Sequence, residues 1–351
     1  MDTIIMIGTT ILDQFQQPTL SFLIAGMMLA ALGSRFEIPE PVYKFIVILL
    51  LLKVGMGAGI SVRSANLIDL IVPALGATAV GIVIVLIGSV TLARHRGVSQ
   101  VDGLATAGLF GAVSASTLAA GMAILDDNGM AYEGFIGALY PFMDIAALVT
   151  AITMAKLAAA RRAVTVSGGA GVIAGGPTAK PGNAGTNGGM VRDILVDTFQ
   201  SPAISALIAG LVLGAFAQPE TVYHSFYEPL FKGLLSILML IMGMEAWSRL
   251  SELRKVAHTY ILYGVTAPFI HGLIGFGVGL IAHELTGFSG GGVVLLSVMA
   301  ASSSDISGPP TIRAALPEAN ASAYLGTSTG LGTPVAILSI PLFVALAEAL
   351  I

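Results

Sequence analysis

Long apolar stretches separated by short polar connections recur along the chain and predict membrane-spanning helices. A helix needs about 20 predominantly apolar residues to cross the hydrocarbon core of a bilayer. An apolar stretch at 3–12 is too short for this, and we expect it to lie at the interface or against the bundle. The chain is predicted to be an all-α polytopic membrane protein with ten transmembrane helices, at 17–34, 41–61, 66–93, 102–124, 132–158, 200–217, 229–248, 256–283, 290–314 and 321–350.

Basic residues are distributed unevenly among the connections between these spans. Cytoplasmic connections of membrane proteins carry an excess of Lys and Arg. Thirteen of the 16 basic residues flank or occupy the odd-numbered connections: Arg35, Lys44, Arg94, Arg96, Lys156, Arg161, Arg162, Lys180, Arg192, Arg249, Arg254, Lys255 and Arg313. Only Lys53, Arg63 and Lys232 lie towards the other side. We therefore predict that the odd-numbered connections are cytoplasmic and that both termini lie outside.

Composition supports a lipid environment. Of the 351 residues, 55% are hydrophobic and only 10% are charged, whereas soluble domains carry about 25% charged residues. The 43 glycines suit the close packing of membrane helices. The net charge of −4 gives no indication of nucleic-acid binding, and the lack of cysteine excludes disulfides and cysteine-ligated metals.

The connection after the fifth span is the one long loop. Residues 163–190 are rich in Gly, Ala, Thr and Pro and contain a single charged residue. Such a segment buries too little apolar surface to offset the entropy of ordering it. We predict a flexible cytoplasmic linker that joins a first five-helix repeat, residues 1–162, to a second repeat, residues 191–351.

The two halves share short stretches of sequence in the same order. The matches are 17–26 with 201–210, Lys44 with Lys232, Gly55 and Met56 with Gly243 and Met244, and 112–117 with 300–305. Because each half has five spans, an odd number, the second half is expected to be inverted relative to the first. Secondary transporters are often built from such 5+5 inverted repeats, with substrate and coupling ion bound where broken helices meet. The alternative interpretation is a duplication retained only for packing.

Two corresponding spans carry signals of a broken helix near their middle. In 102–124, small hydroxyl residues lie at 114–117, and in 290–314 a run of serines and Asp305 precedes Pro309 and Pro310. The prolines remove two backbone donors and restrict the residue before them. Freed backbone groups at this depth are tolerated only inside protein or along a cavity. The two breaks therefore predict a binding site.

These segments offer groups suited to both an anion and a cation. The N-terminus of a half-helix presents free N–H donors to an anion, and freed carbonyls, hydroxyls and carboxylates are ligands for a hard cation. No Lys or Arg lies in the middle of either segment, which favours a small monovalent oxyanion. Candidate substrate-binding residues are Ser114, Ala115, Ser116, Thr117, Ser302, Ser303 and Ser304. Candidate sodium ligands are Asp305, Ser304, Ser307, Asp144 and Thr117.

The candidates also have structural interpretations. An ionisable residue in a membrane span is a functional candidate by default, so we expect Asp305 to bind sodium or carry a proton, although it can instead cap the broken helix. Asp144 can be a buried carboxylate with a local partner, and the serines can serve close helix packing. We expect Lys53 to extend towards the interface. Residues 332–334 form a further candidate break.

The sequence does not indicate an enzyme. It contains no His-Glu-x-x-His pair and no Cys/His metal cluster. A P-loop is also missing, so the chain cannot itself use ATP to drive transport. An ion gradient, with sodium as the coupling ion, is the expected energy source.

Four stretches carry a resemblance to a known family: 109–120, 137–150, 233–248 (GLLSILMLIMGMEAWS) and 300–313 (AASSSDISGPPTIR). The strings GLLSILMLIMGMEAW and SSSDISGPPT in the last two are specific rather than generic membrane sequence. In these stretches, and over nearly its whole length, the chain resembles the cyanobacterial sodium-dependent bicarbonate transporter family, SbtA. The resemblance implies a sodium–bicarbonate symporter of the plasma membrane that serves a carbon-concentrating mechanism. It also implies a homotrimer, an elevator movement of a core domain against a scaffold, and control by a cytosolic PII-like protein, SbtB, that reads adenine nucleotides.

Matched position by position, the family's binding residues correspond to Ser114, Ser116, Thr117, Ser302, Ser303, Ser304, Asp305 and Ser307. The chain departs from the family pattern at Ala115, where Gly is expected, and in its short Gly-rich loop, where the family often has a longer charged segment. The resemblance therefore does not extend to regulation through this loop. Alternatives to bicarbonate symport are a sodium- or proton-coupled transporter of another small anion, an anion channel, and a membrane sensor.

Overall fold

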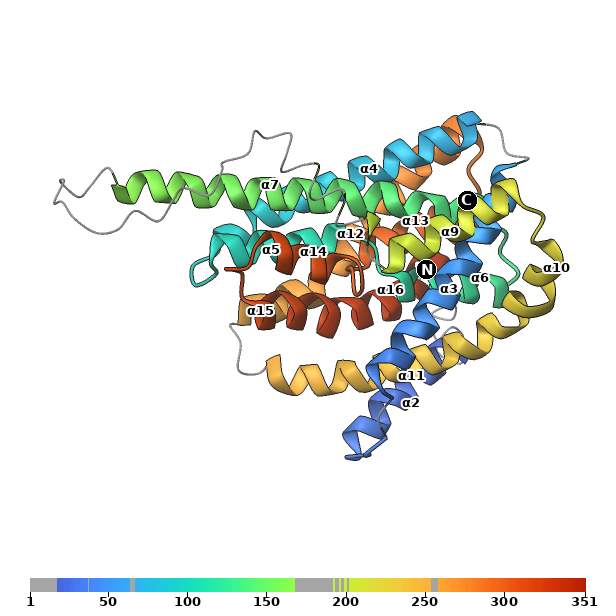
Figure 1. The fold of residues 1–351 in the computed structure, drawn as a ribbon, viewed down its shortest axis with the longest axis horizontal. Helices are drawn as coiled ribbons and strands as arrows, with labels where there is room; N and C mark the ends of the chain where they lie inside the picture. The colour runs from blue at the N-terminus through green and yellow to red at the C-terminus, as the bar shows by residue number, and fades with distance from the viewer. Residues whose placement is uncertain are drawn as a thin grey trace.

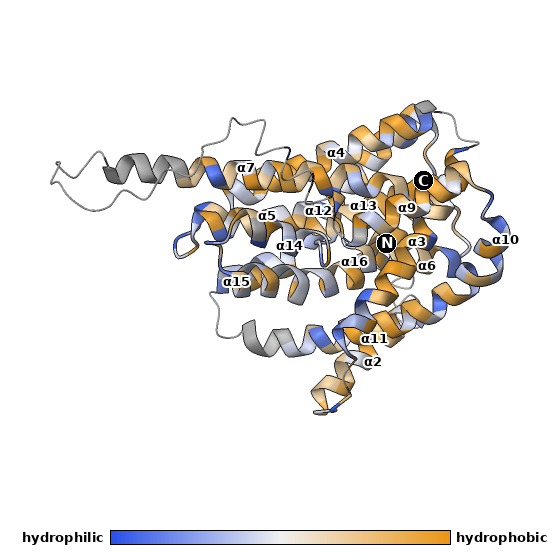
Figure 2. Cartoon of the chain, in the orientation of Figure 1, coloured by the Kyte–Doolittle hydropathy of each residue, from blue (hydrophilic) through white to orange (hydrophobic). Residues whose placement is uncertain are grey.

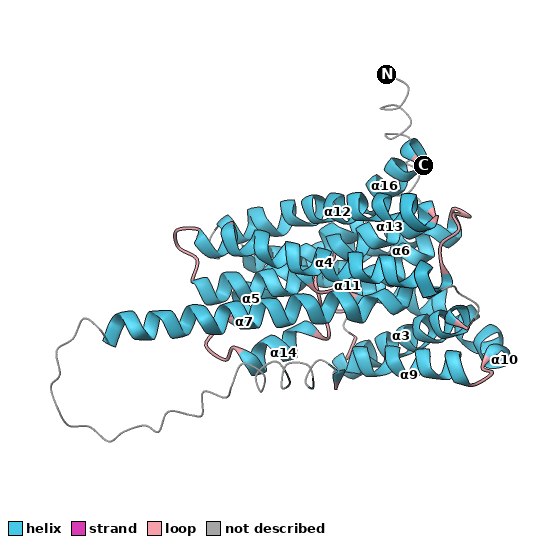
Figure 3. Cartoon of the chain, turned by 90° about the horizontal axis from the view of Figure 1, so that it is seen from above, coloured by secondary structure: helices cyan, strands magenta, loops and turns pink. Residues whose placement is uncertain are grey.

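Every regular element in the described part of the chain is a helix (Figure 3). The computed structural model describes residues 18–36, 38–63, 67–167, 192, 196, 199–200, 202–253 and 258–351. The apolar stretch at 3–12 and residues 168–190 of the predicted linker lie outside these ranges.

The helices of the two halves follow one another in chain order. The first half contains α2 (Pro18–Ala31), α3 (Glu40–Val62), α4 (Leu67–Val90), η1 (Leu92–Arg94), α5 (Gln100–Gly111), α6 (Ala115–Asp127), η2 (Gly134–Leu139) and α7 (Tyr140–Ser167). The second half contains α9 (Pro202–Phe216), α10 (Glu220–Val222), η3 (Tyr223–Tyr227), α11 (Glu228–Leu253), α12 (His258–Thr286), α13 (Gly290–Ala301), α14 (Gly308–Ala315), α15 (Ala321–Leu325), η4 (Gly326–Gly332) and α16 (Thr333–Leu350). Two of the short elements, η3 and η4, are π-helical.

Among the described residues, seven helical stretches are long and apolar enough to cross a membrane: Glu40–Val62, Asp69–Arg94, Gln100–Asp127, Gly134–Ala159, Glu220–Ser248, His258–Thr286 and Ala321–Leu350. Three shorter apolar helices, Pro18–Ala31, Ile204–Phe216 and Gly290–Ala301, occupy the remaining predicted spans. Their length is below the roughly 20 residues that a bilayer core needs. Apolar residues dominate along most of the helices (Figure 2), as in a multi-pass membrane protein.

The helices pack in two groups (Figure 1). α2 packs along α11, α3 packs along α9, and α3 also touches α11. We call these four helices the side bundle. The helices α4 to α7 and α12 to α16 pack mainly on one another and form the main bundle. Each bundle therefore combines helices from both halves of the chain.

Inside the side bundle the helix backbones touch, because glycines line both of its main contacts. A Cβ atom added at any of these glycines would collide with a carbonyl oxygen of the facing helix. Small residues at such places allow membrane helices to approach closely. The glycines and the carbonyls they face are Gly55 and Leu207, Gly210 and Leu52, Gly26 and Leu240, and Gly243 and Leu23.

Both of the predicted helix breaks are present. The fourth predicted span is divided between α5, which ends at Gly111, and α6, which begins at Ala115. The ninth is divided between α13, which ends at Ala301, and α14, which begins at Gly308. The chain between the paired half-helices is non-helical, so its backbone groups need other partners.

Two local expectations differ from the structure. α7 continues to Ser167, so residues 163–167, which the sequence assigns to the linker, are helical. The reason is that the helix-disfavouring glycines begin only at residue 168. At 332–334 the chain is not interrupted, since η4 leads directly into α16. Pro334 is the second residue of α16, and the π-helical turn of η4 directly before it accommodates the proline without ending the helix.

Replacing Gly55 by Ala should destabilise the protein, because the new Cβ atom would push α3 away from α9. Overpacking of this kind costs about 1–3 kcal/mol, which should lower the melting temperature in detergent. The matched control is Gly277→Ala in α12, where a Cβ would meet nothing within 4 Å. That variant should melt at the wild-type temperature or slightly above it, because Ala favours a helix. Equal melting temperatures for the two variants would contradict the backbone contact.

Candidate functional site

The first break turns the chain from α5 into α6 and gathers hydroxyl groups at the start of α6. Ser114 is extended, with φ −91° and ψ 125°, and its Oγ accepts the N–H of Thr117 at 3.1 Å. Ser favours this N-cap position because its side chain satisfies a first-turn N–H group. Ser114 Oγ also accepts the hydroxyl of Thr117 at 3.0 Å and is hydrogen-bonded to Ser116 Oγ at 2.9 Å. All three residues are fully buried.

The second break lies directly against the first. The N–H of Ser114 donates to Ser302 Oγ at 3.0 Å, and the N–H of Ser304 donates to the Leu109 carbonyl at 2.8 Å. Ser302 Oγ in turn donates to the Met299 carbonyl at 2.7 Å. These bonds satisfy backbone groups that the breaks leave without helical partners. The two broken helices therefore meet, as the sequence predicts.

Asp305 connects the two breaks through its side chain. Its Oδ2 accepts the hydroxyl of Ser116 at 2.6 Å. Its Oδ1 has no hydrogen-bond partner among the described residues. The residue also lines a cavity between the two bundles, so it is not turned towards lipid. Asp305 thus offers one carboxylate oxygen close to the first turn of α6.

Asp144, on α7, is fully buried and connects the same two breaks. Its Oδ1 accepts the N–H of Val113 at 3.1 Å and the hydroxyl of Ser307 at 3.3 Å. Its Oδ2 has no hydrogen-bond partner in the described part of the chain. Both partners are distant in sequence, so Asp144 is not a carboxylate held by a local partner. It links α7 to both interrupted helices.

The hydroxyls of Ser304 and Ser307 lie beside Asp144. They are 2.9 Å apart, and Ser307 Oγ is 3.4 Å from the hydroxyl of Tyr140. Tyr140 is fully buried at the first residue of α7. The sequence did not predict this residue, and its one signal is the position directly before Pro141 at the start of a span.

The N-terminus of α14 corrects one expectation from the sequence. Ser304 Oγ accepts the N–H of Gly308 at 2.8 Å, and the next two residues are prolines, which have no N–H group. The first turn of α14 therefore has no free donor for an anion. In α6, by contrast, the N–H groups of Ala115 and Ser116 lie in the first turn and have no intrahelical acceptor. Backbone donors for an anion belong to the first break.

Ser303 differs from its neighbours because its side chain contacts the tenth predicted span. Its Oγ donates to the Ser328 carbonyl at 2.9 Å and is hydrogen-bonded to Thr333 Oγ1 at 3.0 Å. Thr333 Oγ1 also donates to the Ser303 carbonyl at 3.1 Å. Residues 326–330 read Gly-x-Ser-x-Gly, but here they are π-helical, and Ser328 Oγ donates to the Tyr324 carbonyl at 2.6 Å. Ser303 thus holds the second break on η4.

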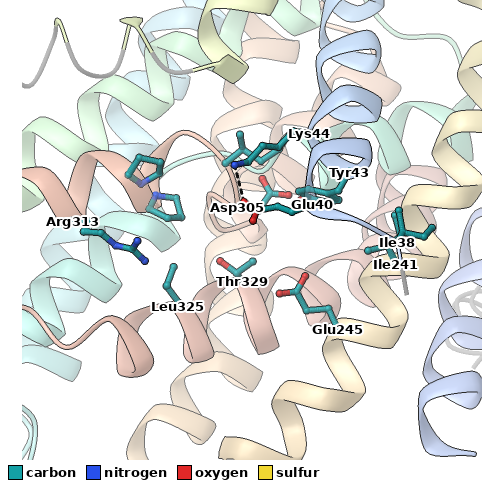
Figure 4. Close-up of a pocket in the computed structure, with 13 residues that line it drawn as sticks. Ile38, Glu40, Tyr43, Lys44, Ile241, Glu245, Asp305, Arg313, Leu325 and Thr329 are labelled. Atoms are coloured by element: carbon teal, nitrogen blue, oxygen red, sulfur yellow. Dashed lines mark ion pairs between the residues drawn. The ribbon is translucent and has the colours of Figure 1, made fainter. Parts of the chain in front are cut away.

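A cavity of about 960 Å³ reaches Asp305 from one side (Figure 4). The N-terminal end of α3 and part of α11 line one wall, and the second break with α14, α15 and η4 lines the other. Its charged lining residues are Glu40, Lys44, Glu245, Asp305 and Arg313, and Lys44 Nζ is paired with Glu40 Oε1 at 2.7 Å. The cavity lies between the side bundle and the main bundle. The sequence predicts that Lys44 and Arg313 are on the cytoplasmic side.

Lys53, which we expect to extend towards the interface, lies against aromatic rings. The residue is only 7% exposed. Its Nζ lies 4.2 Å from the ring centroid of Phe231 and 5.8 Å from that of Tyr223. Aromatic rings attract a cation over their faces. The charge is therefore held against the rings of Phe231 in α11 and Tyr223 in η3.

The chain matches a known protein family over nearly its whole length. A family model described as the Na⁺-dependent bicarbonate transporter superfamily matches residues 18–348. The match covers both helix breaks and Asp144. No curated protein matches the chain in a sequence search.

Cysteine introduced at Ile306, beside Asp305, should react with a membrane-impermeant thiol reagent that enters the cavity. The chain has no cysteine of its own, so a single variant gives no background. The matched control is Ile312→Cys on α14, because Ile312 is fully buried in the main bundle. Ile306→Cys should react in inside-out vesicles and Ile312→Cys should not. Faster reaction of Ile306→Cys from outside intact cells than in inside-out vesicles would overturn the predicted orientation of the cavity.

Proposed function

The chain belongs to the Na⁺-dependent bicarbonate transporter superfamily, and from this premise we propose that it is a secondary active symporter that imports bicarbonate together with sodium. The observation that carries the proposal is the 2.6 Å hydrogen bond from Ser116 to Asp305. It joins the helix end suited to an anion to the carboxylate suited to a cation.

The proposed anion site is the first turn of α6. The N–H groups of Ala115 and Ser116 supply backbone donors at the positive end of the helix dipole. The hydroxyls of Ser114, Ser116 and Ser302 lie beside them and can rotate to donate. Bicarbonate is a planar monovalent oxyanion, and such donors hold it without a Lys or Arg. Binding through dipoles also allows release, which a transporter requires.

The proposed sodium ligands surround the two carboxylates. Asp305 Oδ1 and Asp144 Oδ2 are oxygens without partners in the described residues, and oxygen is the ligand that hard cations prefer. The hydroxyls of Ser304 and Ser307 lie beside Asp144, and that of Thr117 lies near Ser114. Together these five residues give a set of oxygen ligands on both breaks. Ser303, whose hydroxyl contacts η4, supports the second break rather than the ligand set.

Charge explains why the two ions are taken up together. An anion at the first turn of α6 lies close to Asp305, because Ser116 contacts both groups. Two like charges about 4–6 Å apart repel by about 3–4 kcal/mol at an effective dielectric constant of about 20. That repulsion corresponds to a loss of affinity of about 100-fold or more. Sodium bound at Asp305 replaces this repulsion by attraction, so anion binding depends on sodium.

We propose that the two halves form a 5+5 inverted repeat of ten spans. The four glycine contacts of the side bundle support this, because two of them repeat the other two. The contact of Gly26 with Leu240 corresponds to that of Gly210 with Leu52. The contact of Gly243 with Leu23 corresponds to that of Gly55 with Leu207. Between α2 and α9 the corresponding positions are 184 residues apart, as for Gly26 and Gly210 or Leu23 and Leu207. Between α3 and α11 they are 188 residues apart, as for Gly55 and Gly243 or Leu52 and Leu240. One pair of helices thus packs as a copy of the other.

Movement of the main bundle against the side bundle is the proposed transport step. The cavity at their boundary supports this, because it gives the site access from one side. We further propose, from the resemblance to the SbtA family, a homotrimer in the plasma membrane with both termini outside. A cytosolic PII-like partner of the SbtB type is proposed on the same ground, as is a role in a carbon-concentrating mechanism.

Replacing Asp305 by Asn should abolish sodium-driven uptake, because the neutral amide neither holds sodium nor couples it to the anion. The wild-type protein in proteoliposomes should concentrate labelled bicarbonate when sodium is imposed outside. Asp69→Asn, in the first turn of α4, is the matched control and should keep uptake. Sodium-driven accumulation by Asp305→Asn would reduce Asp305 to a structural role. Accumulation by the wild type on a proton gradient alone would favour proton coupling, and equilibration without accumulation would favour a channel.

Replacing Ala115 by Pro should weaken anion binding, because it removes one N–H donor at the first position of α6. Proline suits this position, and Ser114 already has the extended backbone that precedes a proline. Losing a hydrogen bond to a charged group costs about 1.5–3 kcal/mol, so we expect the KM for bicarbonate to rise about tenfold or more. Ala321→Pro makes the same change at the start of α15 and should leave the KM unchanged. An unchanged KM in an Ala115→Pro protein with a wild-type melting temperature would contradict the proposed anion site.

A further inference from the structure

We propose that Lys232 and Asp127 form a latch that closes the binding site on the side away from the cavity and opens in each transport cycle; this inference rests on the proposed function. Lys232 Nζ is paired with Asp127 Oδ1 at 2.6 Å. Lys232 belongs to α11 of the side bundle and Asp127 is the last residue of α6 in the main bundle. The pair therefore bridges the boundary at which the bundles are proposed to move.

The pair lies at the opposite end of the boundary from the cavity. Glu245 lines the cavity and follows Lys232 by 13 residues on α11, which is about 20 Å of helix. Asp127 follows Ser116 by 11 residues on α6, or about 16 Å. The proposed site at the start of α6 thus lies between the open cavity and the ion pair.

The residues next to the pair are held in place within their own bundles. Phe231, next to Lys232, is 3% exposed and lies under the ammonium group of Lys53. Lys53 belongs to α3 and Phe231 to α11, so this contact joins two helices of the side bundle next to the ion pair. Asp126, next to Asp127, accepts the hydroxyl of Tyr132 at 3.0 Å. Because Lys232 and Asp127 belong to different bundles, parting them is the step that we propose for opening at this end.

The sequence repeat supports the proposal that the Lys232–Asp127 ion pair opens and closes. Lys44 and Lys232 are 188 residues apart, as are Glu40 and Glu228, so each lysine has a glutamate four residues before it. At the open cavity, Lys44 pairs with Glu40 of its own helix at 2.7 Å. At the closed end, Lys232 crosses to Asp127, and Glu228 contacts His224 at 2.7 Å instead.

One sequence element thus adopts two arrangements at the two ends of the boundary. Where access is open, the lysine binds its own helix, and where access is closed, it binds the other bundle. Inverted repeats that alternate access are expected to hold their copies in such different arrangements. On opening, Lys232 would leave Asp127 for Glu228, an i, i+4 pairing that helices favour.

The exposure of the pair suits a contact that must break repeatedly. The Lys232 side chain is 62% exposed and that of Asp127 is 17% exposed. Ion pairs in contact with solvent contribute little, so we expect the latch to bias the closed arrangement about two- to fivefold. A bias of that size keeps one side closed without trapping the protein.

The first test measures accessibility and does not depend on transport. A Phe231→Cys variant, in a chain that otherwise lacks cysteine, should react slowly with an impermeant thiol reagent applied on the Lys232 side. Adding Asp127→Asn should raise the reaction rate about two- to fivefold. The charge-reversed pair Lys232→Asp with Asp127→Lys should bring the rate back down. Equal rates in all three proteins would overturn the latch.

The second test locks the boundary. Lys232→Cys with Asp127→Cys, joined by a short bis-methanethiosulfonate reagent, should lose sodium-driven uptake and regain it after reduction. Lys232→Cys with Glu228→Cys is the matched control, because both residues lie on α11 and the link does not cross the boundary. Undiminished uptake by the cross-linked Lys232–Asp127 variant would refute the latch while leaving the symport proposal intact. Absence of sodium-driven uptake in the wild-type protein would instead refute the symport proposal, and the labelling rates would still decide the latch.

Discussion

The structure depends on the need to satisfy backbone groups at two helix breaks inside the main bundle. A break leaves N–H and C=O groups without helical partners, and in a membrane protein such groups must be paired within the protein or face a cavity. Here each break supplies partners for the other, since Ser114 donates to Ser302 and Ser304 donates to Leu109. Asp144 adds a third connection by accepting from Val113 and Ser307. Neither break could keep this conformation without the other, so the site forms only when both halves of the chain are packed together.

The groups that remain after this mutual pairing define the chemistry of the site. The first turn of α6 keeps two N–H groups without intrahelical acceptors, and one oxygen of each carboxylate has no partner in the described residues. The N–H donors of α6, which suit an anion, are thus separated from the Asp305 carboxylate, which suits a cation, by a single hydroxyl, that of Ser116. At the start of α14 no donor is left for an anion, because Ser304 Oγ accepts the N–H of Gly308 and the two prolines have no N–H group. The second break is therefore left with oxygen ligands, and the first with donors.

The sequence predicts the elements of this site better than their pairing. Tandem prolines after Asp305, and hydroxyl residues at 114–117 in an otherwise apolar span, correctly predict both breaks. The sequence does not predict that the first turn of α14 lacks free N–H donors, because this depends on Ser304 Oγ accepting the N–H of Gly308. The contact of Ser303 with Thr333 was also missed, since it requires knowing that η4 is π-helical and lies beside the break. Such contacts join residues far apart in sequence, and no local pattern encodes them.

Helices pack more closely within the side bundle than at the boundary between the two bundles, and the proposed movement takes place at this boundary. Within the side bundle, glycines bring helix backbones into contact, and separating them would lose close packing along both contacts. Between the bundles, the boundary contains a cavity, long charged side chains and an ion pair with an exposed lysine. Contacts of this kind are easily broken and formed again, because water replaces them at little cost. The side bundle is therefore expected to stay rigid while the main bundle moves against it. The binding site, held entirely in the main bundle by the two breaks, then changes access without losing its own hydrogen bonds.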